Sequence, residues 1–193
     1  LVIDIIEAGP ELMWVNPRPL DALDNPDCGF DDSARSFLTP SGEWAPMGTP
    51  ISGTYAYDMA GKDTSLSYDG KTAAVAVPSH LKATDGELNG KVSVYQFNGT
   101  DWAQLGSDII GENSGDQFGW STDLSKDGSV LAVGARKNNG NGIGENAGHA
   151  RVFRYTDNDW VQMGSDIDGL GEENSFGGKL GLSDDGLTLV AGA

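Results

Sequence analysis

The sequence predicts an all-β chain made of repeated four-stranded antiparallel sheets, and three observations support this. Trp44, Trp102 and Trp160 stand 58 residues apart, and each opens a similar phrase that ends in glycine. Apolar residues come in short runs bounded by Gly, Asp and Asn, without the longer apolar stripe of a helix. Glycine accounts for 28 of the 193 residues, about twice its usual share, which suits tight turns between many short strands.

Further landmarks keep the 58-residue interval. Asp-Gly pairs recur at 69–70, 127–128 and 185–186, and Gly90 recurs as Gly148. No insertion separates the copies, so this regularity indicates a true internal repeat.

The second copy shows the elements of one repeat. Residues 118–124 and 130–135 are predicted strands joined by a hairpin turn, in which Asp127-Gly128 supplies the positive φ that such a turn needs. A long loop leads to a third strand over 149–155, and a fourth strand is predicted over 160–167. Four antiparallel strands in about 58 residues make one blade of a β-propeller.

The repeat divides the chain into four predicted segments. They are a degenerate first blade with an N-terminal extension at 1–56, two blades at 57–114 and 115–172, and the first two strands of a further blade at 173–193. In the first copy the strand phases fall at 2–6, 12–15, 33–39 and 44–51. A closed propeller needs at least about four blades, so we expect an incomplete ring that further sequence or another chain completes.

The charge balance argues against some classes of function. The chain has 12 Lys and Arg residues against 29 Asp and Glu residues, a net charge of −17 and a pI of about 4.1. Such a chain repels phosphate backbones and anionic lipids, so we expect no nucleic-acid partner. No apolar run approaches the ~18 residues of a membrane span, so we expect no membrane insertion. Cys28 is the one cysteine, which leaves either a buried thiol or a disulfide to a cysteine outside this sequence.

Several phrases together resemble a known repeat. Gln117-Phe-Gly119 and Ser175-Phe-Gly177 are each followed by Leu-Ser-x-Asp-Gly and by a Leu-x-x-Gly-Ala strand, and Gly148-x-x-x-Val-Phe-x-Tyr155 completes the second copy. This pattern resembles FG-GAP repeats, the blade repeats of the integrin α-subunit head and of many secreted proteins, over residues 53–193. The resemblance implies a β-propeller with an extracellular or surface role in binding, with calcium held in some blades between the first two strands. Met59-Ala-Gly61 departs from the Phe-Gly pattern, and most of the Asp-x-Asp-x-Asp-Gly calcium pattern is missing.

One hairpin loop is a candidate calcium site. Asp123, Ser125 and Asp127 offer oxygens at its first, third and fifth positions, and Ca²⁺ takes six to eight such hard ligands. The aligned loops at 65–70 and 181–186 lack the first carboxylate. The alternative is that Ser-x-Asp-Gly is only a hairpin turn capped by side-chain oxygens.

The long loop of the second copy is a candidate ligand face, together with the aligned residues 78–89 and with one tryptophan. Trp44, Trp102 and Trp160 share one phase of the repeat, which favours packing between blades, whereas Trp120 lies outside that phase. A solvated loop, and a Trp120 that fills a gap between blades, are the alternatives. The candidate ligand-binding residues are Trp120, Asn138, Asn139, Asn141, Glu145 and Asn146.

These observations favour a non-catalytic, extracellular or surface β-propeller module that mediates protein binding or assembly. One alternative is a secreted propeller that binds or cleaves carbohydrate, and another is a structural subunit docked in a larger complex. His80 and His149 accompany no Ser or Cys nucleophile motif, so we expect no enzyme. Asn98-Gly-Thr100 is an N-glycosylation sequon on a predicted turn, which suits a secreted chain.

Overall fold

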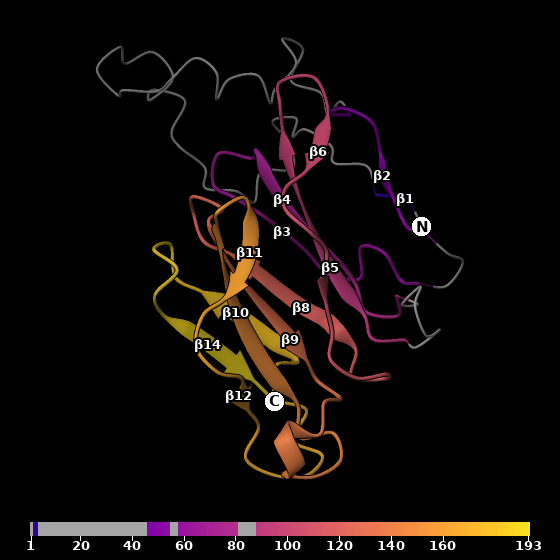
Figure 1. Cartoon of the computed structure of the whole chain (residues 1–193), viewed down its shortest axis with the longest axis vertical. Coiled ribbons are helices and arrows are strands. Elements are labelled where there is room, and N and C mark those ends of the chain that lie inside the picture. Colours follow the sequence, from indigo (N-terminus) through magenta and orange to yellow (C-terminus); the bar gives the residue numbers. More distant parts are fainter. Residues whose placement is uncertain (1, 4–45, 55–57, 81–87) are drawn as a thin grey trace, which may run out of the picture. The chain divides into compact units, whose positions relative to one another are not determined.

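The computed structural model describes residues 2–3, 46–54, 58–80 and 88–193. These residues form antiparallel β-sheets, with no α-helix among them (Figure 1). A 3₁₀ turn, η4 (Gly140–Gly142), interrupts one loop. Within the described ranges no helix is long and apolar enough to cross a membrane. The all-β prediction is therefore confirmed. Trp44, Cys28 and most of the first copy lie outside the described residues.

The first large sheet contains residues 64–110 and follows the blade pattern. Its neighbouring strands run in the order β3, β4, β5, β6, and the short β7 also pairs with β5. The strands are β3 (Thr64–Leu66), β4 (Thr72–Val77), β5 (Lys91–Phe97), β6 (Trp102–Gln104) and β7 (Ile109–Ile110). β4 is buried along its whole length, as expected for a strand with packed layers on both faces.

The second large sheet repeats this arrangement between residues 118 and 168. Its order is β8, β9, β10, β11, and β12 pairs with β10. The strands are β8 (Phe118–Leu124), β9 (Val130–Ala135), β10 (His149–Thr156), β11 (Asp159–Gln162) and β12 (Ile167–Asp168). The bounds of β8 and β9 confirm the predictions, and β10 is one residue longer than predicted.

The prediction of one continuous fourth strand over residues 160–167 is wrong. The chain leaves the ladder after Gln162 and returns only at Ile167. Gly164 has a φ of +72°, which breaks the extended backbone. The fourth element is therefore two short strands, β11 and β12, which pair with different parts of β10.

Two smaller strand pairs complete the described structure. β13 (Lys179–Leu182) pairs with β14 (Leu189–Gly192), and β1 (Val2–Ile3) pairs with β2 (Ile51–Ser52). In the described part of the predicted strand over 44–51, only Ile51 is in a strand. Pro46 and Pro50 lack an N–H for a ladder, and Gly48 between them has a φ of +75°.

A shared apolar core lies between the two large sheets. It joins Ala76 and Val92 of the first sheet to Leu131 and Val133 of the second, with Phe118 at 0 % exposure. The Phe118 ring meets the Phe153 ring edge to face, with centroids 6.3 Å apart. Burial of side chains of this size stabilises the fold by about 1.5–3 kcal/mol each.

Trp160 packs between the two large sheets, as predicted for the repeated tryptophans, whereas Trp102 is half-buried and its ring lies 5.4 Å from that of Phe97 in its own sheet. The Trp160 side chain is 8 % exposed, and its Nε1 donates a 2.8 Å hydrogen bond to the carbonyl of Leu105 in the preceding sheet. The neighbouring Tyr155 ring lies 5.4 Å away, centroid to centroid. The indole therefore supplies both apolar area and one polar tie between sheets.

The Phe-Gly pair of the repeat forms a β-bulge at the start of β8. The pairing with β9 shifts between Phe118 and Ser121, Gly119 has a φ of +88°, and the Trp120 N–H donates to the Gln117 carbonyl. Phe118 points into the core and also forms a parallel bridge to Gly90 of the preceding sheet. A Cβ at Gly90 would collide with the Phe118 carbonyl, so this seam requires glycine. Bulges redirect side chains, and this one places Trp120 half-exposed at the end of the sheet.

Candidate functional site

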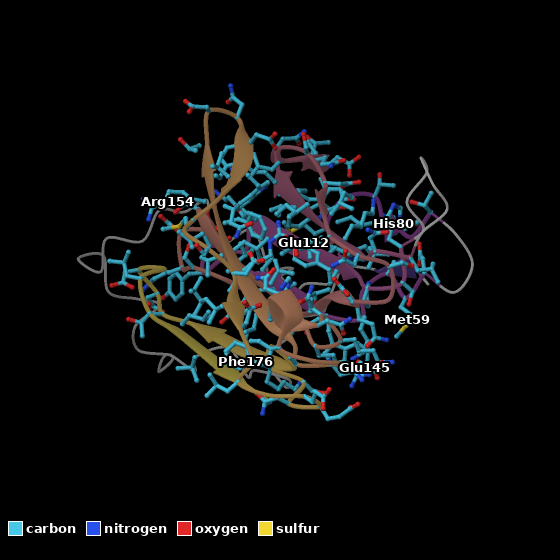
Figure 2. The ribbon with its side chains drawn as sticks, turned by 60° about the horizontal axis from the view of Figure 1, so that its bottom comes forward. Met59, His80, Glu112, Glu145, Arg154 and Phe176 are labelled. Atoms are coloured by element: carbon cyan, nitrogen blue, oxygen red, sulfur yellow. The ribbon has the colours of Figure 1, made fainter. Side chains whose placement is uncertain are left out.

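The loop over 136–147, which joins β9 to β10, carries most of the candidate ligand residues. Asn138 is 4 % exposed; its Nδ2 donates to Asp116 Oδ2 at 2.7 Å, and its Oδ1 accepts from the Gly140 N–H at 2.7 Å. Asn138 therefore supports the loop from inside and presents no free amide to a ligand. Asn139 and Glu145 are exposed at the surface. Figure 2 turns this end of the sheets toward the viewer and labels Glu145 there.

Contacts to the following segment hold this loop in one conformation. Asn146 Nδ2 donates to both carboxylate oxygens of Glu173 at 3.2 Å, and the Glu173 N–H donates to the Glu145 carbonyl at 2.9 Å. Asn141 Nδ2 donates to Asp168 Oδ2 at 3.0 Å. Asn141 and Asn146 have positive φ values of 50° and 52°, which asparagine tolerates better than most residues. The exposed residues of the loop are thus supported by hydrogen bonds between the loop and the segment that follows β11.

Trp120 lies at the same end of the sheet and is covered by cations of the chain itself. Phe118 pairs with Ala135, so Arg136, the first residue of the loop, stands beside the bulge that carries Trp120. The Arg136 Cζ lies 3.4 Å from the centroid of the Trp120 ring, and Lys62 Nζ lies 4.2 Å from it. Arg136 Nε also donates to Gln117 Oε1 at 2.9 Å. We call Trp120, Arg136 and the exposed residues of the loop over 136–147 the rim surface.

The predicted second half of this face lies over residues 78–89, of which 81–87 are outside the described residues. At its end, Asn89 is 1 % exposed and donates its Nδ2 to the carbonyls of Gly111 and Glu112 at 3.2 and 3.0 Å. Asn89 therefore fixes the chain between the first and second large sheets.

The two carboxylates of the candidate calcium loop accept hydrogen bonds from different parts of the chain. Asp123 Oδ1 accepts from Ser65 Oγ at 3.1 Å, and its Oδ2 accepts from the Leu182 N–H at 2.7 Å. The Asp123 carboxylate thus links β8 to the first strands of the sheets on either side. Asp127 instead accepts from Ser125 Oγ at 2.7 Å and from the N–H and Oγ of Ser129. Each of these carboxylates is thus hydrogen-bonded within the chain, and calcium at this loop stays a prediction.

The Ser-x-Asp-Gly turn has one geometry in all three described copies. Ser67 donates to Asp69 at 2.6 Å and Ser183 to Asp185 at 2.6 Å, as Ser125 does to Asp127. The serine oxygen also accepts from the backbone N–H five residues further along the chain in each copy, at 2.9 Å. Hydrogen bonds from the serine hydroxyl and from the backbone lower the pKa of Asp127 and of Asp185. This is the geometry of a side-chain-capped turn.

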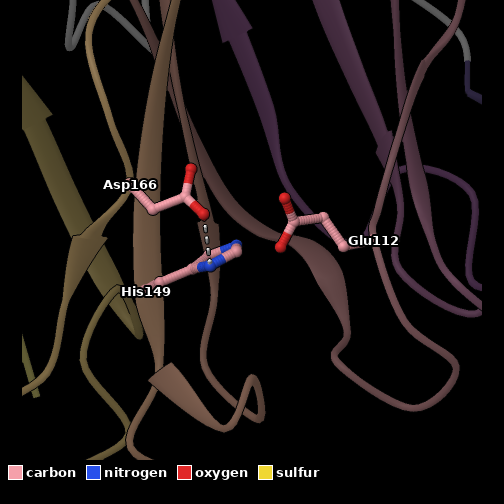
Figure 3. A group of neighbouring side chains, drawn as sticks. All are labelled: Glu112, His149 and Asp166. Carbon is pink, nitrogen blue, oxygen red and sulfur yellow. Dashed lines mark ion pairs between the residues drawn. The ribbon is translucent and has the colours of Figure 1, made fainter. Parts of the chain in front are cut away.

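A buried histidine at the start of β10 belongs to a group that the sequence did not single out. Glu112, His149 and Asp166 bring ligand atoms within 4.8 Å of one another, as Figure 3 shows. His149 is 1 % exposed, and neither ring nitrogen has a hydrogen-bond partner among the described residues. Its Nδ1 lies 3.9 Å from Asp166 Oδ2. Burial lowers the pKa of His149, against a smaller opposite effect of Asp166 and Glu112, so the ring is neutral near pH 7.

Arg151 lies beside this group and touches both of its carboxylates. Its Nη1 is 3.7 Å from Glu112 Oε1, and its Nε is 3.7 Å from Asp166 Oδ1. The guanidinium also lies over the Phe118 and Phe153 rings, about 5 Å from each centroid. Two carboxylates, one guanidinium and a neutral imidazole leave this group with one net negative charge. We call Glu112, His149 and Asp166 the histidine cluster.

Residues 111–153 match the model of a family described as FG-GAP repeat. This segment is therefore similar to an FG-GAP repeat. No curated protein matches the chain. The FG-GAP match begins at Gly111, spans β8, β9 and the loop over 136–147, and ends at Phe153 within β10. The predicted resemblance is confirmed over residues 111–153, and the antiparallel sheets are those of a β-propeller.

Residues before β8 contribute to both sites, since Lys62 lies over the Trp120 ring and Glu112 belongs to the histidine cluster. Glu112 comes from the segment after β7, whereas His149 and Asp166 belong to the next sheet. The sequence held one indication that a cation lies near Trp120, because Lys62 occupies the position aligned with Trp120 in the preceding copy. It offered none for the histidine cluster, whose members are far apart in the chain.

Asn98 lies where the sequence placed it, at the tip of the hairpin between β5 and β6. Its Oδ1 accepts from the N–H groups of Thr100 and Asp101, both at 2.9 Å, and all three positions from Asn98 to Thr100 are exposed. The amide nitrogen that a glycan would modify is thus at an exposed turn.

Proposed function

We propose that the chain is a non-catalytic β-propeller module, at the cell surface or outside the cell, that binds a protein partner through the rim surface. The FG-GAP repeat supports this proposal because such repeats are typical of protein-binding propellers of extracellular and surface proteins. The observation that carries it is the loop over 136–147, whose exposed residues stand on a frame of hydrogen bonds to the next segment. A preformed loop loses little conformational entropy on binding.

Trp120 is the anchor that we assign to this surface. Tryptophan and arginine are enriched among residues that dominate protein interfaces, and here Arg136 is stacked on Trp120 at 3.4 Å. Ile143, which is 44 % exposed, adds apolar area within the same loop. The Arg136 guanidinium occupies a ring face that a sugar would need for stacking, so the contact favours a protein over a carbohydrate ligand.

The test uses a photo-crosslinking amino acid in the full-length protein, expressed in its native host. One variant carries it at Asn141 on the rim surface, and a control carries it at Tyr68, an exposed residue in the Asp-Gly turn at the opposite end of the sheets. We expect a discrete protein adduct from position 141 and none from position 68.

The partner identified in this way is then measured against two alanine variants. We expect Trp120→Ala to weaken its binding at least tenfold and Tyr68→Ala to leave it unchanged. Tyr68 is a matched control because its ring also carries a cation, with Lys126 Nζ at 4.3 Å. Equal adducts from both positions, or equal affinity of both variants, would contradict the proposal. Binding of the full-length protein to a glycan array would support the carbohydrate alternative instead.

A further inference from the structure

The first large sheet pairs a partly exposed carboxylate with a lysine. Lys91, the first residue of β5, donates from Nζ to Asp108 Oδ2 at 2.8 Å. Ser93 Oγ and Gln104 Nε2 both donate to Asp108 Oδ1, at 2.6 and 2.9 Å. Every oxygen of this carboxylate therefore faces a donor of its own sheet.

The second large sheet repeats this arrangement but lacks the ammonium group. Asp166 and Gln162 are the residues 58 positions after Asp108 and Gln104, and Gln162 Nε2 still donates to Asp166 Oδ1 at 2.8 Å. His149 stands where Lys91 stands, yet its Nδ1 stays 3.9 Å from Asp166 Oδ2, which is too far for a hydrogen bond. The shorter imidazole does not reach the carboxylate, and both of its buried ring nitrogens are without a hydrogen-bond partner among the described residues.

A third side chain near His149 and Asp166 comes from the preceding blade. Glu112 follows β7, its side chain is 41 % exposed, and its carboxylate lies within 4.8 Å of the ligand atoms of His149 and Asp166. Figure 3 shows the imidazole lying between the two carboxyl groups. A transition metal bonds imidazole nitrogen and carboxylate oxygen at about 2.0–2.2 Å, so a small inward movement of the partly exposed Glu112 side chain would bring all three within bonding distance.

We propose that Glu112, His149 and Asp166 form a binding site for a divalent transition-metal ion of the zinc class. The donor set is one imidazole and two carboxylates, which suits Zn²⁺ and its neighbours better than calcium, an all-oxygen ion. Three protein ligands leave further positions of the metal to water. The metal takes the place of the Lys91 ammonium and joins two consecutive blades.

Arg151 and Gln162 orient the carboxylates around this site. Both touch Asp166 through Oδ1, which leaves Oδ2, the oxygen nearer to His149, for the metal. Arg151 likewise faces Glu112 through Oε1. Such outer contacts fix the direction of metal ligands. The net negative charge of the cluster, with Arg151 included, attracts a cation.

Isothermal titration of the metal-stripped, full-length protein with zinc chloride alone tests the proposal. We expect a zinc site that is weakened at least tenfold in Glu112→Gln and in Asp166→Asn, and lost in His149→Lys. The lysine variant recreates the Lys91–Asp108 pair of the preceding sheet, so it should fold and keep its melting temperature without metal. His80→Gln is the matched control, because His80 is the other histidine of the chain and lies outside the cluster.

A second measurement separates this site from any weak surface binding of zinc. Cobalt(II) in place of zinc should give a visible absorption band from an imidazole-ligated ion in the wild type and in His80→Gln, and none in His149→Lys. Absence of zinc binding by the wild type, equal zinc binding by His149→Lys, or displacement of zinc by equimolar calcium would overturn the proposal. Partner binding through the rim surface is a separate readout, and neither result decides the other.

Discussion

The two large sheets repeat one backbone but differ in the side chains that fill equivalent positions. Both use the same strand order, the same Ser-x-Asp-Gly turn and, near the start of the first strand, a glycine with positive φ at the same position of the repeat. Yet Lys91 and Asp108 form a direct ion pair in one sheet, whereas His149 and Asp166 stand 3.9 Å apart in the other. Likewise, Phe118 fills the core where the preceding copy has Ala60. The recurring glycines and turns thus determine the backbone of each sheet. The few side chains that differ determine which ion pairs and core contacts each sheet forms.

The largest effect on stability should come from giving the second sheet the residue that the first sheet has at the position of Phe118. Phe118→Ala reproduces the residue of the first sheet, but it removes a fully buried ring from the shared core. We expect the free energy of unfolding to fall by about 3–5 kcal/mol, measured by urea denaturation. Leu187→Ala, at a side chain 71 % exposed, is the control and should change stability by less than about 0.5 kcal/mol. A loss under about 1 kcal/mol for Phe118→Ala would show that the seam between sheets is loosely packed.

The next largest effect on stability should come from removing the Lys91 ammonium group of the first sheet. Lys91→Met leaves Asp108 without its ammonium partner, and we expect a loss of about 1–2 kcal/mol, because hydrogen bonds to charged groups contribute more than neutral ones and Asp108 is partly exposed. Gln96→Met, at an exposed position of the same strand, is the control. Equal stability of the two variants would show that the ion pair contributes nothing.

The same pair makes a pH prediction. Burial raises the pKa of Asp108, but hydrogen bonds from Lys91 and Ser93 outweigh it, so the pKa of Asp108 lies below its usual value. The unfolded chain then binds a proton at higher pH than the folded chain does, so this contribution is present above about pH 4 and is lost as the pH falls further. Unfolding curves between about pH 5 and pH 2.5 should show this loss in the wild type. A Lys91→Met variant with the same acid dependence would contradict the assignment.

A smaller effect should come from Asp123, where the neighbouring copies have Ser65 and Gly181. Asp123→Ala removes the acceptor for Ser65 Oγ and for the Leu182 N–H, and we expect a loss of about 1–2 kcal/mol. Thermal unfolding with calcium chloride and with EDTA tests the calcium prediction at the same time. A calcium-dependent rise in melting temperature that Asp123→Ala abolishes would show that the carboxylate can turn to a metal; equal curves would leave only its role between strands.

The smallest effect on stability should come from Asn98, whose sequon has no counterpart in the second sheet. Asn98→Gln is expected to change the free energy of unfolding by about 0.5 kcal/mol or less, since only an exposed turn is affected. The substitution should also lower the mass of the protein, because wild-type protein secreted from eukaryotic cells should carry a glycan at Asn98 that the variant lacks. Asn158→Gln, at the equivalent hairpin of the second sheet, is the control and should keep the wild-type mass increment. An unmodified Asn98 in such material would argue against secretion.

Local signals in the sequence were sufficient for the first three strands of the second copy, for the turn between β8 and β9 and for the repeat. The facing ends of β8 and β9 follow from the Asp127-Gly128 turn between them, because turn formation depends on residues adjacent in the chain. The prediction of one continuous fourth strand was wrong because Gly164 interrupts the extended backbone, and the residues around it do not form a recognisable turn sequence. The tryptophan phase correctly predicted that Trp160 packs between two sheets, since residues that recur at one phase of a repeat are typically structural.

The chemistry of the sites was decided only by the tertiary structure. Asn138 and Asn139 look alike in the sequence, yet one is buried and bonded to Asp116 while the other is exposed. The role of Asp123 depends on Ser65 and Leu182, which lie 58 and 59 residues away. The histidine cluster draws on three segments from two blades. A repeat sequence by itself determines how each blade folds, because those interactions are local; which side chains meet across a seam depends on how blades pack together.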